Sequence, residues 1–205
     1  MQKKTSAEPT GSVPVDNSYS RLQVTKVKAL PPSYEIRGMS GAKVGDVLAF
    51  AQRIPVVPFK KVNFYRDSSK AEPLWSFRAD KPFLTKNRYQ VVDLKDSLLG
   101  TFEKDYGKSF SNAKFTLETA NGMKAFGADS QIMLNAMRLM MDFKGQVKYL
   151  FQDEMKNTVM TIDRGWKQAD SYIVTMAKTK NGQVDWRLGA CLGVALDTLL
   201  LTSVG

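Results

Sequence analysis

The sequence contains no histidine and only one cysteine, Cys191, and these shortages exclude several kinds of chemistry. Without an imidazole base, catalytic groups of the Ser-His-Asp or Cys-His type cannot form. Zinc sites that need imidazole are excluded as well, and one cysteine can build neither a thiolate metal site nor an intrachain disulfide. We therefore expect no metal, no cofactor and no oxidising compartment.

The N-terminus also lacks the features that direct a chain to a membrane or out of the cell. It has no apolar run of the kind found in secretory signals. Met1-Gln2 lacks the glycine that N-myristoylation requires. We therefore expect a cytoplasmic protein whose contact with a membrane, if it has one, is peripheral.

Length and composition indicate one globular domain. The chain has 205 residues, of which 43% are hydrophobic and 24% are charged, as in ordinary globular proteins. Residues 1–30 are rich in Ser, Thr, Pro and Lys, and we expect them to form a flexible tail. Pro31-Pro32 is expected to mark the beginning of the fold, which would cover residues 31–205 and be a monomer.

Most of the remaining chain shows the alternation of polar and apolar residues that is typical of strands. Val62 and Phe64 share one face of a short stretch, and Trp75 and Phe77 share a face of the next. Asn121-Gly122 indicates a hairpin, because both residues tolerate positive φ. The predicted strands run from Tyr34 and over residues 47–52, 61–66, 74–78, 89–94, 98–103, 114–118, 123–127, 139–143, 146–151, 159–163 and 172–176.

One stretch, residues 129–138, can be interpreted in two ways. Ile132, Met133 and Met137 recur at helical spacing after a possible cap at Asp129 or Ser130, yet the same residues fit a strand. Methionines at this spacing are usually core residues in either case. We leave helix and strand open here and expect a strand from about Leu139.

The C-terminal segment is different, because residues 186–201 are almost entirely apolar. Asp185 is a suitable N-cap for a helix over these residues, which would be about 24 Å long. A bilayer requires roughly twenty apolar residues, so this helix is too short to cross one. Asp197 interrupts the run. A helix that is apolar on all sides must be buried in protein or lipid. Gly189 and Gly193 would let a wall approach the helix closely, although the same spacing also occurs in dimerising membrane helices. A closed sheet around a central helix fits both halves of the chain.

At this point the chain resembles the tubby C-terminal-like superfamily, which includes the phospholipid scramblases and the LURP-one-related proteins. The segment from Val184 to Asp197 resembles the final helix of that group, and Tyr89-Gln-Val-Val-Asp93 followed by Leu99-Gly100 resembles its repeated strand pairs. The resemblance implies a mainly β fold, a roughly twelve-stranded antiparallel barrel around a hydrophobic C-terminal helix. It also implies a non-enzymatic protein that is associated with phosphoinositides or other membrane phospholipids, in some members with gene regulation.

Two departures limit what the resemblance implies. Scramblases carry an acid-rich calcium-binding segment before the final helix, whereas residues 178–185 offer only Asp185. Calcium prefers six to eight oxygen ligands, several of them carboxylates, so we expect no calcium site. The clustered cysteines that scramblases use for acylation are also absent. We therefore do not carry lipid scrambling over to this chain.

The positive charge is concentrated in one part of the sequence. The net charge is +10, and residues 53–88 contribute nine basic and three acidic residues, which is +6 of this total. A local positive field attracts phosphate groups of lipids or nucleic acids. The residues that we predict to contact anionic headgroups are Lys60, Lys61, Arg66, Lys70, Arg78, Lys86 and Arg88.

Three alternatives compete with phospholipid binding. A barrel that only binds other proteins or has a structural role is the main one, because folds of this kind host many functions. A nucleic-acid binder would use Phe64, Tyr65, Trp75 and Phe77 for stacking, although alternation places about half of them in the core. An enzyme would need acid–base pairs such as Asp93 with Asp96 or Asp153 with Glu154, but turn acids are usually solvated caps. We expect no enzymatic activity.

Overall fold

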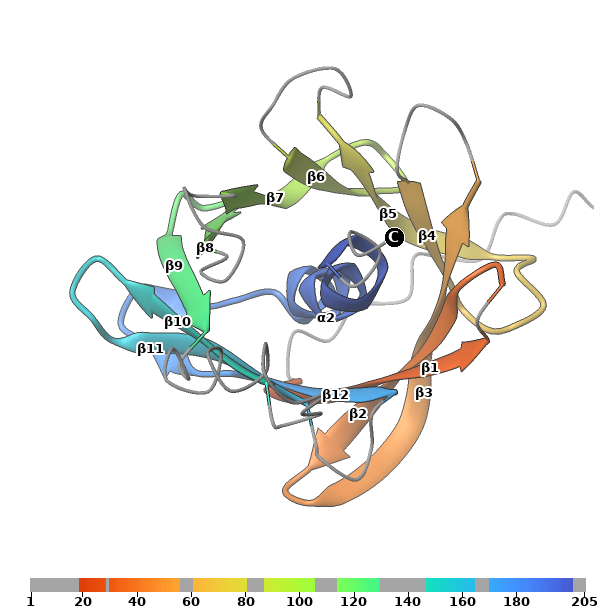
Figure 1. Ribbon diagram of the computed structural model, residues 1–205, viewed down its shortest axis with the longest axis horizontal. Coiled ribbons are helices and arrows are strands. Elements are labelled where there is room, and N and C mark those ends of the chain that lie inside the picture. The colour runs from red at the N-terminus through yellow and green to blue at the C-terminus, as the bar shows by residue number, and fades with distance from the viewer. Residues whose placement is uncertain are drawn as a thin grey trace, which may run out of the picture.

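The computed structural model describes residues 19–28, 30–55, 61–80, 87–105, 114–129, 147–164 and 170–200. Within these residues, twelve strands form a closed antiparallel barrel whose order follows the chain, and β1 pairs with β12 to close it. Helix α2 (Trp186–Leu200) lies in the middle of the ring of strands (Figure 1). The mainly β fold, the barrel and the central helix are therefore confirmed.

The elements have the following bounds. The barrel strands are β1 (Arg21–Lys28), β2 (Ser33–Ser40), β3 (Lys43–Ile54), β4 (Lys61–Tyr65), β5 (Pro73–Ala79), β6 (Asn87–Asp93), β7 (Leu98–Asp105), β8 (Lys114–Thr119), β9 (Lys124–Asp129), β10 (Val147–Asp153), β11 (Thr158–Arg164) and β12 (Ser171–Met176). A short hairpin of β13 (Lys178–Thr179) and β14 (Gly182–Gln183) connects β12 to α2. Of the ambiguous residues 129–138, Asp129 is the last residue of β9 and so does not cap a helix. Residues 130–138 and the strand expected over 139–143 lie outside the described residues.

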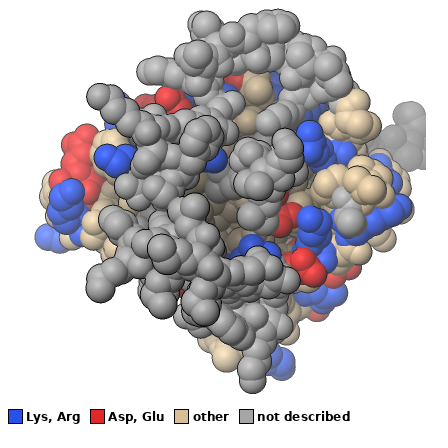
Figure 2. Space-filling view, in the orientation of Figure 1, with Lys and Arg blue, Asp and Glu red and all other residues tan. Residues whose placement is uncertain are grey.

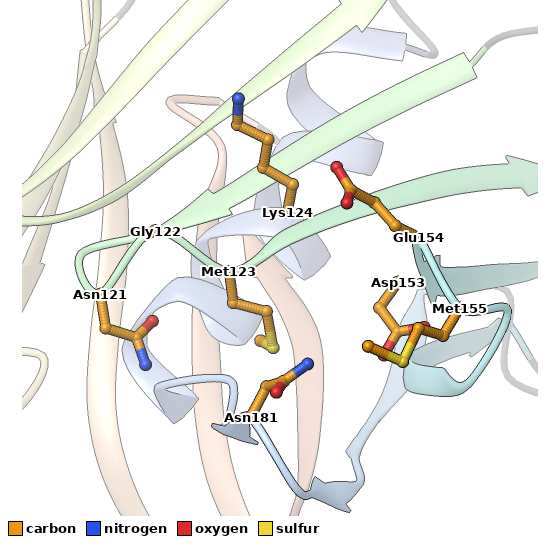
Figure 3. A pocket seen from close by; sticks show the side chains of 8 residues that line it. All are labelled: Asn121, Gly122, Met123, Lys124, Asp153, Glu154, Met155 and Asn181. Carbon is orange, nitrogen blue, oxygen red and sulfur yellow. The ribbon is translucent and has the colours of Figure 1, made fainter.

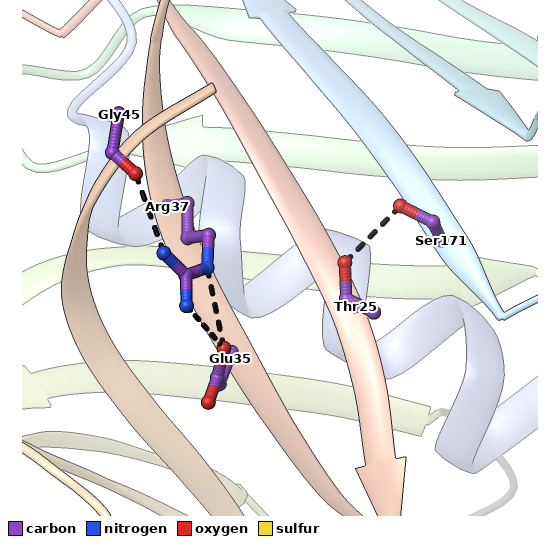
Figure 4. Close-up of polar contacts among 5 residues, drawn as sticks. All are labelled: Thr25, Glu35, Arg37, Gly45 and Ser171. Atoms are coloured by element: carbon purple, nitrogen blue, oxygen red, sulfur yellow. Dashed lines mark hydrogen bonds and ion pairs between the residues drawn. The ribbon is translucent and has the colours of Figure 1, made fainter.

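The prediction that residues 1–30 are a tail is wrong for β1. Leu22 and Val24 face the core, and β1 pairs with β2 on one side and β12 on the other. The hydroxyl groups of Thr25 and Ser171 lie 3.2 Å apart across the closing seam (Figure 4). The same view shows the Arg37 guanidinium donating to Glu35 on the outside of β2. Pro31-Pro32 lies between β1 and β2, so it does not mark the beginning of the fold.

The predicted alternation of inward and outward residues is confirmed in β4 and β5. Phe64 and Trp75 are cross-strand partners inside the barrel, and their rings stack with centroids 4.7 Å apart. Phe77 is buried beside them. Of the four aromatic residues considered for stacking on nucleic-acid bases, only Tyr65 faces outward, so three are core residues.

The Asn121-Gly122 hairpin is confirmed, but its turn is longer than the two-residue turn that the dipeptide suggests. Only Gly122 has a positive φ, of 83°. The Gly122 N–H donates to the Thr119 carbonyl over 2.9 Å, and the Met123 N–H donates to the Thr119 hydroxyl over 3.1 Å. A polar side chain at the beginning of the turn therefore caps it from within.

Helix α2 begins and packs as the sequence predicts. The Arg187 N–H donates to the Asp185 carboxylate over 2.8 Å, which is the expected N-cap contact. A Cβ added at Gly193 would lie 3.0 Å from a Val24 methyl group, and one at Gly189 would lie 2.8 Å from the Met176 sulfur. These small residues therefore pack against the β1–β12 wall. Among the described residues, no helix is both long and apolar enough to cross a bilayer.

Candidate functional site

Three of the predicted basic residues lie together on the outer wall of the barrel. Lys61 of β4 and Arg78 of β5 are direct cross-strand partners. Arg88 lies on the next strand, β6, and its neighbour Tyr89 faces the core, so Arg88 faces outward. Figure 2 shows Lys and Arg side chains gathered on the side of the barrel where β1, β3 and β4 lie in Figure 1, with carboxylates among them.

The other predicted residues do not join this group. Arg66 and Lys70 lie in the β4–β5 turn, at the opposite end of β4 from Lys61. At about 3.4 Å per residue, five residues along a strand separate the two groups by about 17 Å. Lys60 and Lys86 lie outside the described residues. The structure thus divides the predicted site into a wall group and a turn group.

Several of these cations already have acidic partners. The Arg66 guanidinium donates to both Glu72 oxygens, over 2.5 and 2.8 Å, and this contact lowers the pKa of the Glu72 carboxyl. Arg78 lies 3.5 Å from Asp96, and Arg88 lies 3.7 Å from Glu118. The Arg78 and Arg88 pairs are exposed single contacts worth at most about 1 kcal/mol, whereas the bidentate Arg66–Glu72 pair is the stronger kind.

Lys61 and Lys70 differ from the arginines. Among the described residues, neither lysine lies within ion-pair distance of a carboxylate. Each group of predicted residues therefore contains one lysine that is available to an anion.

The aspartate that interrupts the apolar helix is the centre of a buried polar network. Asp197 is only 5% exposed, and its carboxylate accepts a hydrogen bond of 2.6 Å from the Tyr34 hydroxyl. The Lys26 ammonium lies 2.8 Å from the same carboxylate oxygen, and the Tyr172 hydroxyl lies 3.5 Å from the other. Burial, together with the Asp197 hydrogen bond, raises the pKa of Tyr34, and burial raises that of Tyr172. Both hydroxyls therefore stay protonated and act as donors. The network joins the helix to β1, β2 and β12.

Four inward-facing basic residues near the C-terminal end of α2 are not among the candidates from the sequence. They lie on β1, β3, β7 and β11 and are only partly exposed; they are Lys26, Arg53, Lys104 and Arg164. A helix C-terminus carries partial negative charge, and α2 has no basic residue in its last turn. Of these residues, Lys26 pairs with Asp197 of α2, and the Arg164 guanidinium lies 5.5 Å from the centroid of the Tyr172 ring. These residues can be recognised only once the strand register is known, because the alternation of inward and outward residues then places them on the inner face.

The carboxylates considered for acid–base chemistry have structural partners. The Asp93 carboxylate accepts the Lys95 and Ser97 N–H groups within its turn. The Asp153 carboxylate accepts both the backbone N–H and the side-chain amide of Asn157, which lowers the pKa of Asp153. These contacts resemble the Thr119 cap and favour the ionised form. They explain the two aspartates as turn caps.

A hollow of about 540 Å³ lies at the end of the barrel where α2 begins. The β8–β9, β10–β11 and β13–β14 turns line it, with Met123 and Asn181 facing Asp153 and Met155 across the space (Figure 3). Lys124 and Glu154 point away from its centre (Figure 3). This hollow could not be predicted from the sequence, because its residues come from three separate turns.

The comparisons with known proteins add little to this geometry. No known protein-family profile matches the sequence, and no curated protein sequence matches it. The chain is similar to an X-ray structure of a protein from Arabidopsis thaliana, with 18% identity and a TM-score of 0.49 over 91% of this chain and 98% of that chain. A similarity of this size carries no statement about family or function.

Proposed function

We propose that this protein is a non-enzymatic barrel of the tubby C-terminal-like superfamily that binds anionic phospholipid headgroups at a membrane surface. The family part of the proposal is supported by the closed antiparallel barrel and by the apolar helix inside it with its single aspartate. The functional part is supported by the packing of the interior and by the position of the basic residues.

The observation that carries the proposal is that the helix fills the barrel while unpaired lysines lie outside it. Leu188 and Leu192 of α2 are completely buried against the inward-facing wall residues, among them Phe64 and Phe77. The described interior is thus occupied by side chains. The barrel would therefore contact a lipid at its headgroup and would not enclose the acyl chains. Each lysine near an anionic surface contributes about 1 kcal/mol to binding.

Vesicle co-sedimentation with the full chain tests the proposal. We expect the protein to sediment with phosphatidylserine or phosphoinositide vesicles and to stay in solution with phosphatidylcholine vesicles. Raising the salt from about 0.1 M to about 1 M shortens the Debye length from about 10 Å to about 3 Å, and should release the bound protein. Binding that ignores both lipid charge and salt would contradict the proposal, as would the absence of binding to any vesicle. A gel shift with nucleic acid in the same buffer tests the main rival for the positive charge.

A further inference from the structure

The turns at one end of the barrel share a feature that is not visible in the sequence. Because the strands form a meander, every second connection returns to the same end. These are the turns β2–β3, β4–β5, β6–β7, β8–β9 and β10–β11, together with the segment from β12 to α2. Each of these connections carries or adjoins at least one exposed lysine. We call this set the lysine ring, and its members are Lys43, Lys70, Lys95, Lys124, Lys156, Lys178 and Lys180.

The lysine ring is free of acidic partners within the described part of the chain. Most carboxylates at the same end are already engaged, either by turn N–H groups or by arginines. The engaged residues are Asp67, Glu72, Asp93, Asp96, Asp153 and Asp185. Asp46 and Glu154 are exposed exceptions. Asp67, Asp93 and Asp153 bind neutral N–H groups and keep their negative charge. Seven lysines therefore stand against five carboxylates that have no arginine partner, which leaves an excess of positive charge at this end.

Apolar side chains project from two of the same turns. Leu94 is 64% exposed beside Lys95, and Met155 is 75% exposed beside Lys156. Leu98 is also exposed in the first of these turns. A single exposed apolar residue needs no explanation, but an apolar tip next to a lysine suits a bilayer interface. The apolar group enters the headgroup region, and the long lysine side chain keeps its charge among the phosphates.

We propose that this end of the barrel is the membrane-docking surface, with the lysine ring at the level of anionic headgroups and Leu94 and Met155 inserted between them. The proposal rests on the proposed function and chooses the turn group, with Lys70, over the wall group. The hollow lined by Met155 and Lys124 lies at this end of the barrel (Figure 3). The opposite end, where the C-terminus of α2 lies, then points away from the bilayer.

A position-specific fluorophore tests the docking geometry directly. Cys191 has 0% exposure, so a label will react with a cysteine introduced at the surface. We expect Met155→Cys, carrying an environment-sensitive dye, to shift to shorter emission wavelength on phosphatidylserine vesicles. The opposite end carries a similar pairing, with Val27 48% and Leu30 81% exposed on either side of Lys28, so Leu30→Cys is the control that decides between the two ends. Its emission should not change.

A pair of charge variants gives an independent test. Lys95→Gln/Lys156→Gln removes two charges from the lysine ring, and we expect vesicle partitioning to fall about 25-fold, at about fivefold per lysine. Lys28→Gln/Lys114→Gln removes two exposed charges from the opposite end. We expect this control to change partitioning by about twofold or less, because the charges lie far from the bilayer.

The outcomes separate this inference from the proposed function. Equal losses in the two double variants, or equal dye shifts at positions 155 and 30, would overturn the docking surface while lipid binding itself stands. If the unmodified protein ignores anionic vesicles altogether, both proposals are wrong. Binding of an RNA or an acidic protein that depends on Lys95 and Lys156, without vesicle binding, would assign the ring to another partner and would also overturn the inference.

Discussion

Asp197→Ala is the substitution that tests most directly how the barrel holds its helix. It leaves the buried Tyr34 hydroxyl without its acceptor, which costs about 1–3 kcal/mol. It also removes the counter-ion of Lys26, but this side chain is 28% exposed and can turn toward water, so we add only about 1 kcal/mol. The expected loss in the free energy of unfolding is about 3 kcal/mol. For a chain of this length, that corresponds to a fall in Tm of roughly 6–12 °C.

Thermal unfolding followed by circular dichroism at pH 7 measures this loss, and a double-mutant cycle assigns it. Tyr34→Phe removes only the hydroxyl group and should cost about 1–2 kcal/mol. Because Tyr34 and Asp197 share one hydrogen bond, the double variant should be less destabilised than the sum of the two single variants. A Tm change below about 2 °C for Asp197→Ala, or strict additivity in the cycle, would refute the role of the network.

Three further predictions concern the frame around the helix and the turns. Gly100→Ala should cost about 2–3 kcal/mol in urea unfolding, because a Cβ there would lie 2.7 Å from the Glu118 carbonyl oxygen. Asp185→Ala should cost about 1–2 kcal/mol through loss of the helix N-cap, whereas Asp185→Asn, which can still cap, should cost much less in the same thermal assay. The Asn157 contacts lower the pKa of Asp153, so their stabilisation is present above about pH 4 and is lost as the pH falls through the folded-state pKa. Asp153→Asn should therefore be less stable than the unmodified protein at pH 7, and the difference in Tm should narrow as the pH falls below the pKa of an ordinary aspartate, about 3.9.

The strands and the helix could be predicted because their local patterns agree with their positions in the fold. Val62 and Phe64 alternate with polar neighbours, and a strand with one face in the core requires that alternation. The strand that was missed, β1, has the same alternation at Leu22 and Val24. Averaging the composition of residues 1–30 concealed it, because the Ser, Thr, Pro and Lys of the segment outweigh two buried aliphatic residues.

The network around Asp197 could not be predicted in the same way. Its partner Tyr34 is 163 residues away in the chain, and the contact exists only because the barrel closes around the helix. From the sequence, the aspartate could be recognised as an interruption of an apolar helix, but its partners could not be identified. Long-range pairing of this kind depends on strand register, which one sequence does not fix when several hairpin lengths fit.

The charge distribution shows why counting along the chain identified only part of the candidate surface. In a barrel strand, successive residues alternate between the interior and the outside, and direct cross-strand partners share a face. Arg53 is the partner of the buried Val62 and faces the interior, whereas Lys61, the residue before Val62, faces outward. Residues that lie together at one end come instead from every second turn. Lys43, Lys70 and Lys95 are 27 and 25 residues apart in the sequence, and each lies at a turn of the same end. A charge that recurs at the spacing of two strands and two turns is therefore the pattern that predicts a surface in a meander. The described basic residues of the dense window 53–88 are divided by the fold between one end, the outer wall and the interior.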